Sequence, residues 1–303
     1  MPLYTVEGVV LRTREYGERD RLVTLLDREG VRRTVLAKGV RRPRSSLAAG
    51  VQPYTHSRFL LWKGRSLDGV SQVQVLEALT GLRESLEALA AAAYVAELAE
   101  AFTQEGAASP GVFPVVLAVL RRLAAAPTDA RAHALWLRHA ELRLLDLAGL
   151  GLQLDACQHC GRPLAPRGGP SGRRPAPATG AARTASEAGG ALPPRAIRQQ
   201  PATGDGAGHP AGYSAELGGV LCHRCVPGRP GALPLDPVTW QLLRGVRRLT
   251  PTLAARLRPG DAVLARAAEV VQTHLVYHLG RPFRSHGFLA ILEEARPSPE
   301  APR

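Results

Sequence analysis

The chain contains four cysteines, and they form two Cys-x-x-Cys pairs that lie far apart in the sequence. Cys157 and Cys160 make the first pair, and Cys222 and Cys225 make the second. A two-residue spacer lets both sulfurs of a pair bind one metal ion, and two such pairs supply the four thiolates of a tetrahedral zinc site. A shared ion would join two segments that are separated by 61 residues. The spacing therefore predicts one structural zinc ion per chain, with no coordination position left for water or substrate.

Other uses of these cysteines fit the sequence less well. The first residues, MPLYTVE, lack the basic stretch and apolar core of a secretory signal, so we expect a reducing cytoplasm, where disulfides are disfavoured. A redox pair would need a βαβ setting, which the sequence does not predict. His159 and His223 lie inside the two pairs and could replace a cysteine, although their positions suit a tetrahedral site less well.

The first 80 residues show the short, alternating apolar runs of a β-barrel. Five runs are predicted to be strands, with turn residues between them: 4–11, 21–26, 31–37, 56–62 and 70–76. Five short strands in about 80 residues favour a Greek-key barrel of the OB type, although an SH3-like barrel gives nearly the same pattern. We predict an OB-fold β-barrel over residues 1–80.

Beyond Glu84 the apolar spacing becomes helical. Leu86 and Leu89 begin the apolar stripe of the first helix. Further helices are predicted over residues 114–125, 128–147, 237–249 and 261–279. Pro114 suits a first-turn position, and Asp261 is expected to cap the last helix. The predicted fold class is α+β: an N-terminal OB-fold β-barrel and a C-terminal α-helical domain that a four-cysteine zinc module interrupts.

The composition changes sharply between residues 165 and 212. Of these 48 residues, 12 are alanine, 10 are glycine and 8 are proline. Such a segment cannot offset its ordering entropy by burial, so we predict that it is disordered. The predicted organisation is a barrel (1–80), a helical domain in two parts (81–156 and 231–292), a zinc module (157–230) containing the 165–212 insert, and a flexible tail (293–303).

The chain has 39 basic and 26 acidic side chains, a net charge of +13, which predicts attraction to a polyanion, most simply nucleic acid. Residues 28–44 carry seven basic side chains and a single acid. The candidate nucleic-acid contacts in this stretch are Arg32, Arg33, Lys38, Arg41, Arg42 and Arg44. Clustered guanidinium groups bind phosphates and displace the counterions of the nucleic acid. The resulting affinity depends on salt and is largely independent of base sequence. A solvated basic face is the alternative interpretation.

Four aromatic residues of the barrel region could stack on bases: Tyr16, Tyr54, Phe59 and Trp62. Because aromatic side chains also fill small barrels, we expect each of them to be in the core. The sequence contains no phosphate-binding glycine loop, no GxSxG and no HExxH. We therefore assign no catalytic residue and expect no enzymatic turnover. We also expect no membrane association, because no apolar run approaches the roughly 18 residues of a membrane span.

Several segments, taken in order, resemble the RecO family of bacterial recombination mediators. Residues 8–25, GVVLRTREYGERDRLVTL, resemble the opening strand of the family and the turn after it. Residues 37–45, AKGVRRPRS, are similar to its basic signature, and the two cysteine pairs and residues 277–285, YHLGRPFRS, complete the pattern. The long insert between the cysteine pairs is a departure, since the family usually has a short connection there.

The resemblance implies an OB fold, a helical domain, a zinc module and work that needs no ATP. RecO-like proteins bind single- and double-stranded DNA and anneal complementary strands. With RecR they load RecA onto strands coated by single-strand-binding protein, whose acidic C-terminal tail docks on the helical domain. The resemblance implies DNA contacts at Lys38, Arg41, Arg42 and Arg44 and zinc ligands at the four cysteines, whereas Arg32 and Arg33 are added on charge alone. It also implies a cytoplasmic protein that is nucleoid-associated when bound to DNA.

Other functions remain open at this point. An RNA-binding or ribosome-associated OB-fold protein would share the charge and the barrel. A zinc-dependent nuclease or glycosylase would need His159 or His223 to open the metal site. The seven arginines from Arg162 to Arg198 could add nonspecific DNA affinity, although we favour a passive insert.

Overall fold

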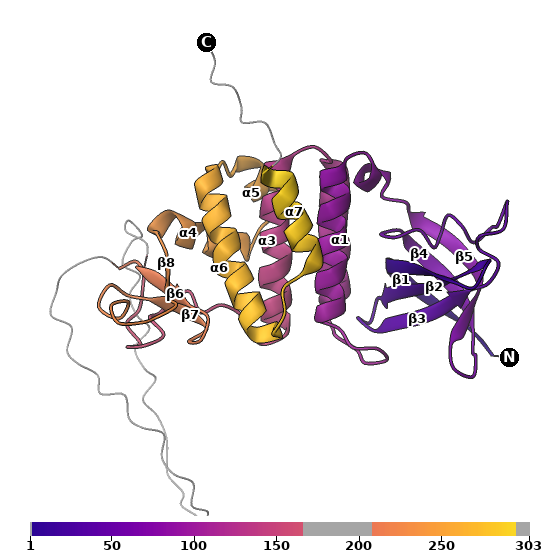
Figure 1. Ribbon diagram of the computed structural model, residues 1–303, viewed down its shortest axis with the longest axis horizontal. Helices are drawn as coiled ribbons and strands as arrows, with labels where there is room; N and C mark the ends of the chain where they lie inside the picture. Colours follow the sequence, from indigo (N-terminus) through magenta and orange to yellow (C-terminus); the bar gives the residue numbers. More distant parts are fainter. Residues whose placement is uncertain (1, 166–207, 295–303) are drawn as a thin grey trace, which may run out of the picture. The chain divides into compact units, whose positions relative to one another are not determined.

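The computed structural model describes residues 2–165 and 208–294 (Figure 1). The chain divides into two compact units, one formed by Met1–Leu152 and Leu242–Arg303 and the other by Gln153–Gln241. Most of the predicted insert and tail, residues 166–207 and 295–303, lies outside the described residues. The insert was predicted to extend too far, however, because Gly212 belongs to a strand. No helix in the described ranges is both long and apolar enough to cross a membrane.

Five strands close into a barrel, as predicted (Figure 1). They are β1 (Leu3–Tyr16), β2 (Asp20–Asp27), β3 (Arg32–Ala37), β4 (His56–Trp62) and β5 (Asp68–Glu77). Around the barrel the order is β1-β2-β3-β5-β4, with β4 pairing back to β1. Only the β3–β5 pair is parallel, and the other four pairs are antiparallel. This closed five-stranded arrangement is OB-like.

Alternating side chains of the strands build the core of the barrel. Val10, Val23, Val35, Phe59 and Leu61 are among its buried members. Strand β1 extends beyond its predicted end, and its pairing with β2 shifts register after Val10 and continues to Tyr16.

The helices of the first unit form a bundle around α3 (Ala130–Leu147). This helix contacts α1 (Leu86–Ala101), α2 (Val112–Ala125), α5 (Pro251–Arg256) and α6 (Asp261–Leu279). Its central place agrees with the prediction from its leucines, which occur on all sides. The short α5 and the C-terminal α7 (Arg284–Glu294) were not predicted, and α7 packs against α1 (Figure 1).

Helix α2 begins two residues before its predicted start, and Pro114, its third residue, lies in the first turn as expected. Two other local predictions about the helices are wrong. Gly260 is the N-cap of α6, so Asp261 lies inside the first turn. In α1, Leu86 and Leu89 are exposed, and the buried face consists largely of alanine.

A histidine at the start of β4 connects the barrel to α2. His56 is 5% exposed, and its two ring nitrogens lie 2.8 Å and 3.2 Å from carboxylate oxygens of Glu77 and Glu7. The ring packs edge-on against Phe113 of α2. From the same helix Arg121 donates hydrogen bonds to Glu77, and these hold the pKa of that carboxyl down to about 2 against the opposing effect of burial. The barrel is therefore fixed to the bundle by paired charges.

The second unit is built on a small antiparallel sheet. Its strands are β6 (Gly212–Ser214), β7 (Gly219–Leu221) and β8 (Leu233–Pro234), in the order β7-β6-β8. The N–H of Val220 donates to the carbonyl of Gln153, and the N–H of Gln153 donates to the carbonyl of Gly218, so the segment before the first cysteine pair is tied to β7. Trp240, in α4 (Pro237–Val246), is fully buried and donates a hydrogen bond to the carbonyl of Leu154. The sheet thus brings the two cysteine-bearing segments together.

Candidate metal centre and nucleic-acid interface

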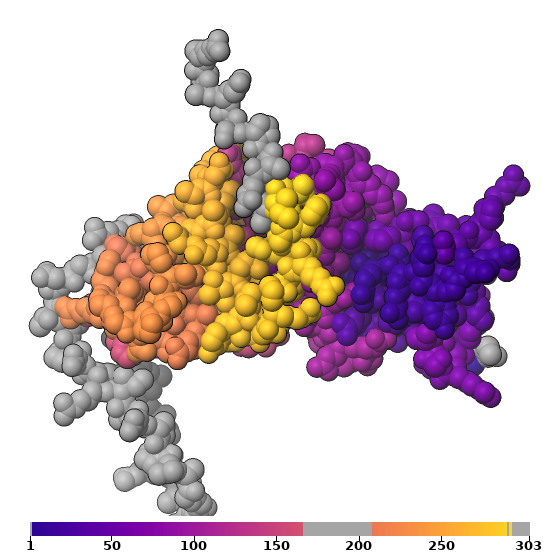
Figure 2. Space-filling view, in the orientation of Figure 1, coloured from indigo at the N-terminus to yellow at the C-terminus, as the bar shows by residue number. Residues whose placement is uncertain are grey.

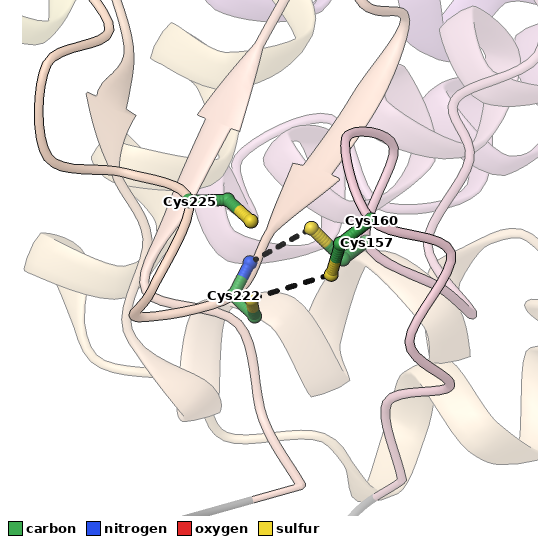
Figure 3. A group of neighbouring side chains, drawn as sticks. All are labelled: Cys157, Cys160, Cys222 and Cys225. Atoms are coloured by element: carbon green, nitrogen blue, oxygen red, sulfur yellow. Dashed lines mark hydrogen bonds between the residues drawn. The ribbon is translucent and has the colours of Figure 1, made fainter. Parts of the chain in front are cut away.

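The four cysteines converge in the second unit, with their sulfur atoms all within 4.8 Å of one another (Figure 3). The sulfurs of Cys160 and Cys222 are 3.8 Å apart. In a tetrahedral zinc site with bonds of about 2.3 Å, neighbouring sulfurs are about 3.8 Å apart. The residues therefore fit a four-thiolate metal site.

Each cysteine pair is a tight backbone turn. The N–H of Gly161 donates to the carbonyl of Cys157 at 2.8 Å, and the N–H of Cys225 donates to the carbonyl of Cys222 at 2.9 Å. Gly161 has a φ of +70°, which glycine adopts without strain. The N–H of Cys222 also donates to the sulfur of Cys157, so the two turns are joined directly (Figure 3).

The surroundings of the thiols favour metal binding. Burial acts to raise the pKa of Cys157, but backbone N–H groups directed at its sulfur bring the pKa down to about 7. Burial and the neighbouring thiols raise the pKa of Cys225. The Cys157 thiol is thus readily deprotonated. Four neighbouring thiolates would repel one another, so deprotonation of all four requires a bound metal cation.

Neither histidine inside the pairs belongs to the ligand group. Within the described ranges, the four cysteines are the only group of three or more potential ligands whose donor atoms all lie close to one another. His159 accepts a hydrogen bond from the guanidinium of Arg229 at 2.6 Å, and the ring of His223 packs edge-on against His209. The structure therefore gives no support to a metal site opened by histidine.

Two of the six basic candidates have internal partners. Arg32 donates to the backbone carbonyl of Glu100 in α1 at 2.7 Å. Arg33 donates to the carboxylate of Asp27 at 2.7 Å, and Asp27 is fully buried. Both arginines lie in β3, are partly buried and stabilise the barrel and its junction with α1. The structure therefore does not group them with the other four candidates.

Lys38, Arg41, Arg42 and Arg44 lie together in the segment between β3 and β4, and all four are exposed. We call these four residues the basic loop. The segment is anchored to the turn between β1 and β2, because the N–H of Gly39 donates to Asp20 and the N–H of Arg41 donates to the carbonyl of Arg19.

Arg19 is a basic neighbour of this loop that sequence reasoning missed. Its side chain is exposed in the turn between β1 and β2, and its carbonyl binds the backbone of Arg41. It stands 22 positions before Arg41 in the chain. Only the pairing of β2 with β3 would have indicated that the two are close.

The aromatic candidates differ in their surroundings. Phe59 is fully buried in the barrel core, as expected. Tyr16 is 51% exposed at the end of β1, and Tyr54 and Trp62 are only partly buried and do not belong to the core cluster. The expectation that every aromatic residue fills the barrel is therefore wrong for these three.

The segment of residues 277–285 has a structural role. Phe283 is 4% exposed and packs edge-on against Tyr94 of α1. The backbone N–H groups of Arg284 and Ser285 donate to the carboxylate of Glu97, which caps α7 from α1. The segment therefore docks the C-terminal helix, which appears in yellow on the face shown in Figure 2.

The helical bundle also contains a groove of about 1300 Å³. Leu135, Leu264 and Leu289 are among its apolar lining residues, and Arg122 and Arg131 are among the basic ones. The groove lies among α2, α3, α5, α6 and α7. Sequence reasoning could not locate it because two of these helices were not predicted.

Comparisons with known proteins place this chain, with its OB-like barrel, helical bundle and four-cysteine centre, in a class of DNA repair proteins. The family model described as "Recombination protein O N terminal" matches residues 1–79, and "Recombination protein O C terminal" matches residues 83–203. The chain belongs to the RecO family, and this membership supports a role in recombination repair.

Full-length relatives agree with this assignment. The chain is 32% identical to the DNA repair protein RecO of Pelotomaculum thermopropionicum, over 95% of this chain and 94% of the relative. It is 35% identical to the RecO protein of Desulforudis audaxviator, over 95% and 97% of the two chains. The RecO protein of Bacillus subtilis is 28% identical, over 96% and 95%.

Replacing Arg33 should destabilise the fold, whereas replacing Arg41 should not. The Arg33→Met variant leaves the buried carboxylate of Asp27 without its cation, at an expected cost of about 2 kcal/mol. Arg41 pairs with Glu15, whose side chain is 63% exposed, so Arg41→Met should cost less than about 1 kcal/mol. Urea unfolding of the two variants and the wild type measures both values.

In DNA binding, the Arg41→Met variant should be the more affected of the two, although it is the less affected in stability. Arg33→Met should bind DNA like the wild type under conditions in which it is folded, and Arg41→Met should bind more weakly. Equal stabilities, or a specific loss of DNA binding in Arg33→Met, would contradict the separation of structural from surface arginines.

Proposed function

We propose that the protein is a nonenzymatic mediator of recombinational DNA repair that binds single- and double-stranded DNA and anneals complementary strands. The observation that carries this proposal is the basic loop, four exposed cationic side chains on one segment of an OB-like barrel. Two strands of DNA repel each other through their phosphates. Cationic side chains that bind both strands lower this repulsion without nucleotide hydrolysis.

The charges of the basic loop are accessible to phosphates. Among the described residues, Arg41 is the only member of the loop that pairs with a carboxylate, at 3.1 Å from Glu15. Exposed pairs of this kind contribute less than about 1 kcal/mol. A phosphate group can therefore compete for Arg41, and the other three side chains need not give up an ion pair in order to bind DNA.

Reversing the arginines of the basic loop should abolish annealing. The variant Arg41→Glu, Arg42→Glu, Arg44→Glu loses three phosphate contacts and places three carboxylates near the strand. We expect no annealing of complementary oligonucleotides above the protein-free rate, in a fluorescence assay without ATP. For a single strand, the slope of log affinity against log salt should fall by about 2.

A control variant separates this local effect from net charge. Reversing the exposed Arg248, Arg256 and Arg281 lowers the net charge by the same six units, from +13 to +7. We expect this control to retain most of the annealing activity. Wild-type annealing by the basic-loop variant, or equal losses in both variants, would refute the assignment, and preference for RNA in a competition assay would favour the RNA-binding alternative.

We also infer that the metal is a single structural zinc ion held by the four cysteines. The support is the donor set, four sulfurs within 4.8 Å of one another on two tight turns. Four thiolates satisfy the tetrahedral preference of zinc and leave no position for a reacting water. When bound, zinc would cross-link the two cysteine-bearing segments and would take no part in a chemical reaction.

Elemental analysis of the native protein should find one zinc per chain. The Cys222→Ser variant should lose the metal, and the second unit should become sensitive to protease, because zinc-binding free energy contributes to folding. The His159→Ala variant is the control and should keep a full equivalent of zinc. Native protein without zinc, or loss of zinc in the control, would reject the proposed ligand set.

We further propose RecR and the acidic tail of single-strand-binding protein as partners, on the strength of family membership. The groove in the bundle is a suitable place for the tail. Its lining combines apolar residues with basic ones, Arg122 and Arg131, and also includes Asp129, Asp261 and Glu269. The apolar lining offers contact to the tail, and the two arginines are the charges that would pair with its carboxylates. Both arginines are exposed.

The Arg122→Glu, Arg131→Glu variant should lose affinity for a peptide of that tail while keeping its DNA affinity. Fluorescence anisotropy of the labelled peptide measures the first and a labelled oligonucleotide the second. Arg143→Glu is the matched control, since the side chain of Arg143 is 41% exposed on α3 but does not line the groove. Unchanged peptide binding in the double variant would exclude the groove.

A further inference from the structure

Trp62 lies on the outer face of the barrel. Side chains alternate along a strand, and Leu61 and Val70, the neighbours of Trp62 and Gly69 in sequence, are buried in the barrel core. Trp62 and Gly69 pair across β4 and β5 and therefore face outward. On the other side of Gly69, β3 contributes Leu36. The indole is thus part of the outer surface of three adjacent strands.

The indole ring of Trp62 packs directly against the backbone of two glycines, Gly69 and Gly64. A Cβ atom at Gly69 would come within 2.1 Å of two ring atoms of Trp62, and one at Gly64 would lie 3.4 Å from the ring. Gly69 is not among the residues with positive φ, so the ring, not the backbone conformation, requires glycine there. One side of the indole is therefore fixed on the sheet.

A flexible cation covers the ring from the side of the basic loop. The ammonium of Lys38 lies over the indole, 5.4 Å from its centroid. Lys38 is exposed and forms no ion pair with any described residue. A cation–π contact at an exposed site is weaker than the stacking of a base on an aromatic ring. A base can therefore displace the ammonium.

We propose that Trp62 is a stacking platform for one unpaired base of single-stranded DNA. The base takes the place of the Lys38 ammonium on the indole, and Lys38 then binds the phosphate of the same strand. Bases inside a duplex are already stacked on their neighbours and cannot reach the ring. Trp62 thus selects single strands, whereas the arginines of the basic loop bind the phosphates of both forms. This inference rests on the proposed DNA binding.

Intrinsic fluorescence tests the platform in the full-length protein. The chain has three tryptophans, and the other two, Trp136 and Trp240, are 6% and 0% exposed. A stacked base should quench Trp62 specifically. We expect oligo(dT) to quench the wild-type emission and the Trp62→Phe variant to lose this quenching, while a duplex causes little change.

Affinities measured by anisotropy complete the test. Trp62→Leu should weaken single-strand binding by about 10-fold or more and duplex binding by less than about 2-fold, and Trp62→Phe should restore most of the single-strand affinity. Absence of quenching in a wild type that binds oligo(dT), or equal losses for both DNA forms in Trp62→Leu, would overturn the platform alone. A wild type that binds neither form would overturn the proposed function as well.

Discussion

The attraction between exposed cationic side chains and phosphates is the interaction on which the account of this protein depends. The barrel permits this attraction because two nearby carboxylates have other partners and do not pair with the side chains of the basic loop. Asp27 is fully buried and paired with Arg33, and Asp20 is occupied by the N–H of Gly39. The cations of the loop therefore face solvent with a single weak partner, Glu15. The same fold that gives Arg32 and Arg33 internal hydrogen-bond partners leaves four basic residues exposed.

The sequence motifs of the family separate into two physical roles. The segment of residues 37–45 carries the basic loop, and its hydrogen bonds to Asp20 and Arg19 anchor it to the segment of residues 8–25. The segment of residues 277–285 instead builds the bundle, through Phe283 against Tyr94 and the capping of α7 by Glu97. The cysteine pairs likewise have a structural place, since they bring four thiols together in the second unit.

The strands, the central helix and the cysteine centre could be predicted from sequence because each depends on local spacing. Alternation defines a strand, leucines on all sides define α3, and two-residue spacers define the metal ligands. The environment of a given arginine could not be predicted in this way. Arg33 and Arg41 look alike in sequence, and only their tertiary partners, Asp27 and Glu15, distinguish them.

The same limit applies to Trp62 and to the groove. Successive side chains of β4 point alternately to the core and to the outer face. The sequence did not show which of these faces Trp62 occupies, because either assignment fits an alternating strand. The groove requires α5 and α7, whose short apolar patterns are not distinctive. Features that depend on tertiary contacts between segments thus escaped the sequence, except the cysteine centre, because each of its two halves carries its own two-residue spacing.

The annealing rate of complementary oligonucleotides as a function of salt, without ATP, is the most direct test of the central claim. If the basic loop offsets phosphate repulsion, the wild-type protein should accelerate annealing strongly at about 50 mM salt and lose most of this effect by about 200 mM. No acceleration at low salt, an acceleration that ignores salt, or a requirement for nucleotide would contradict the account.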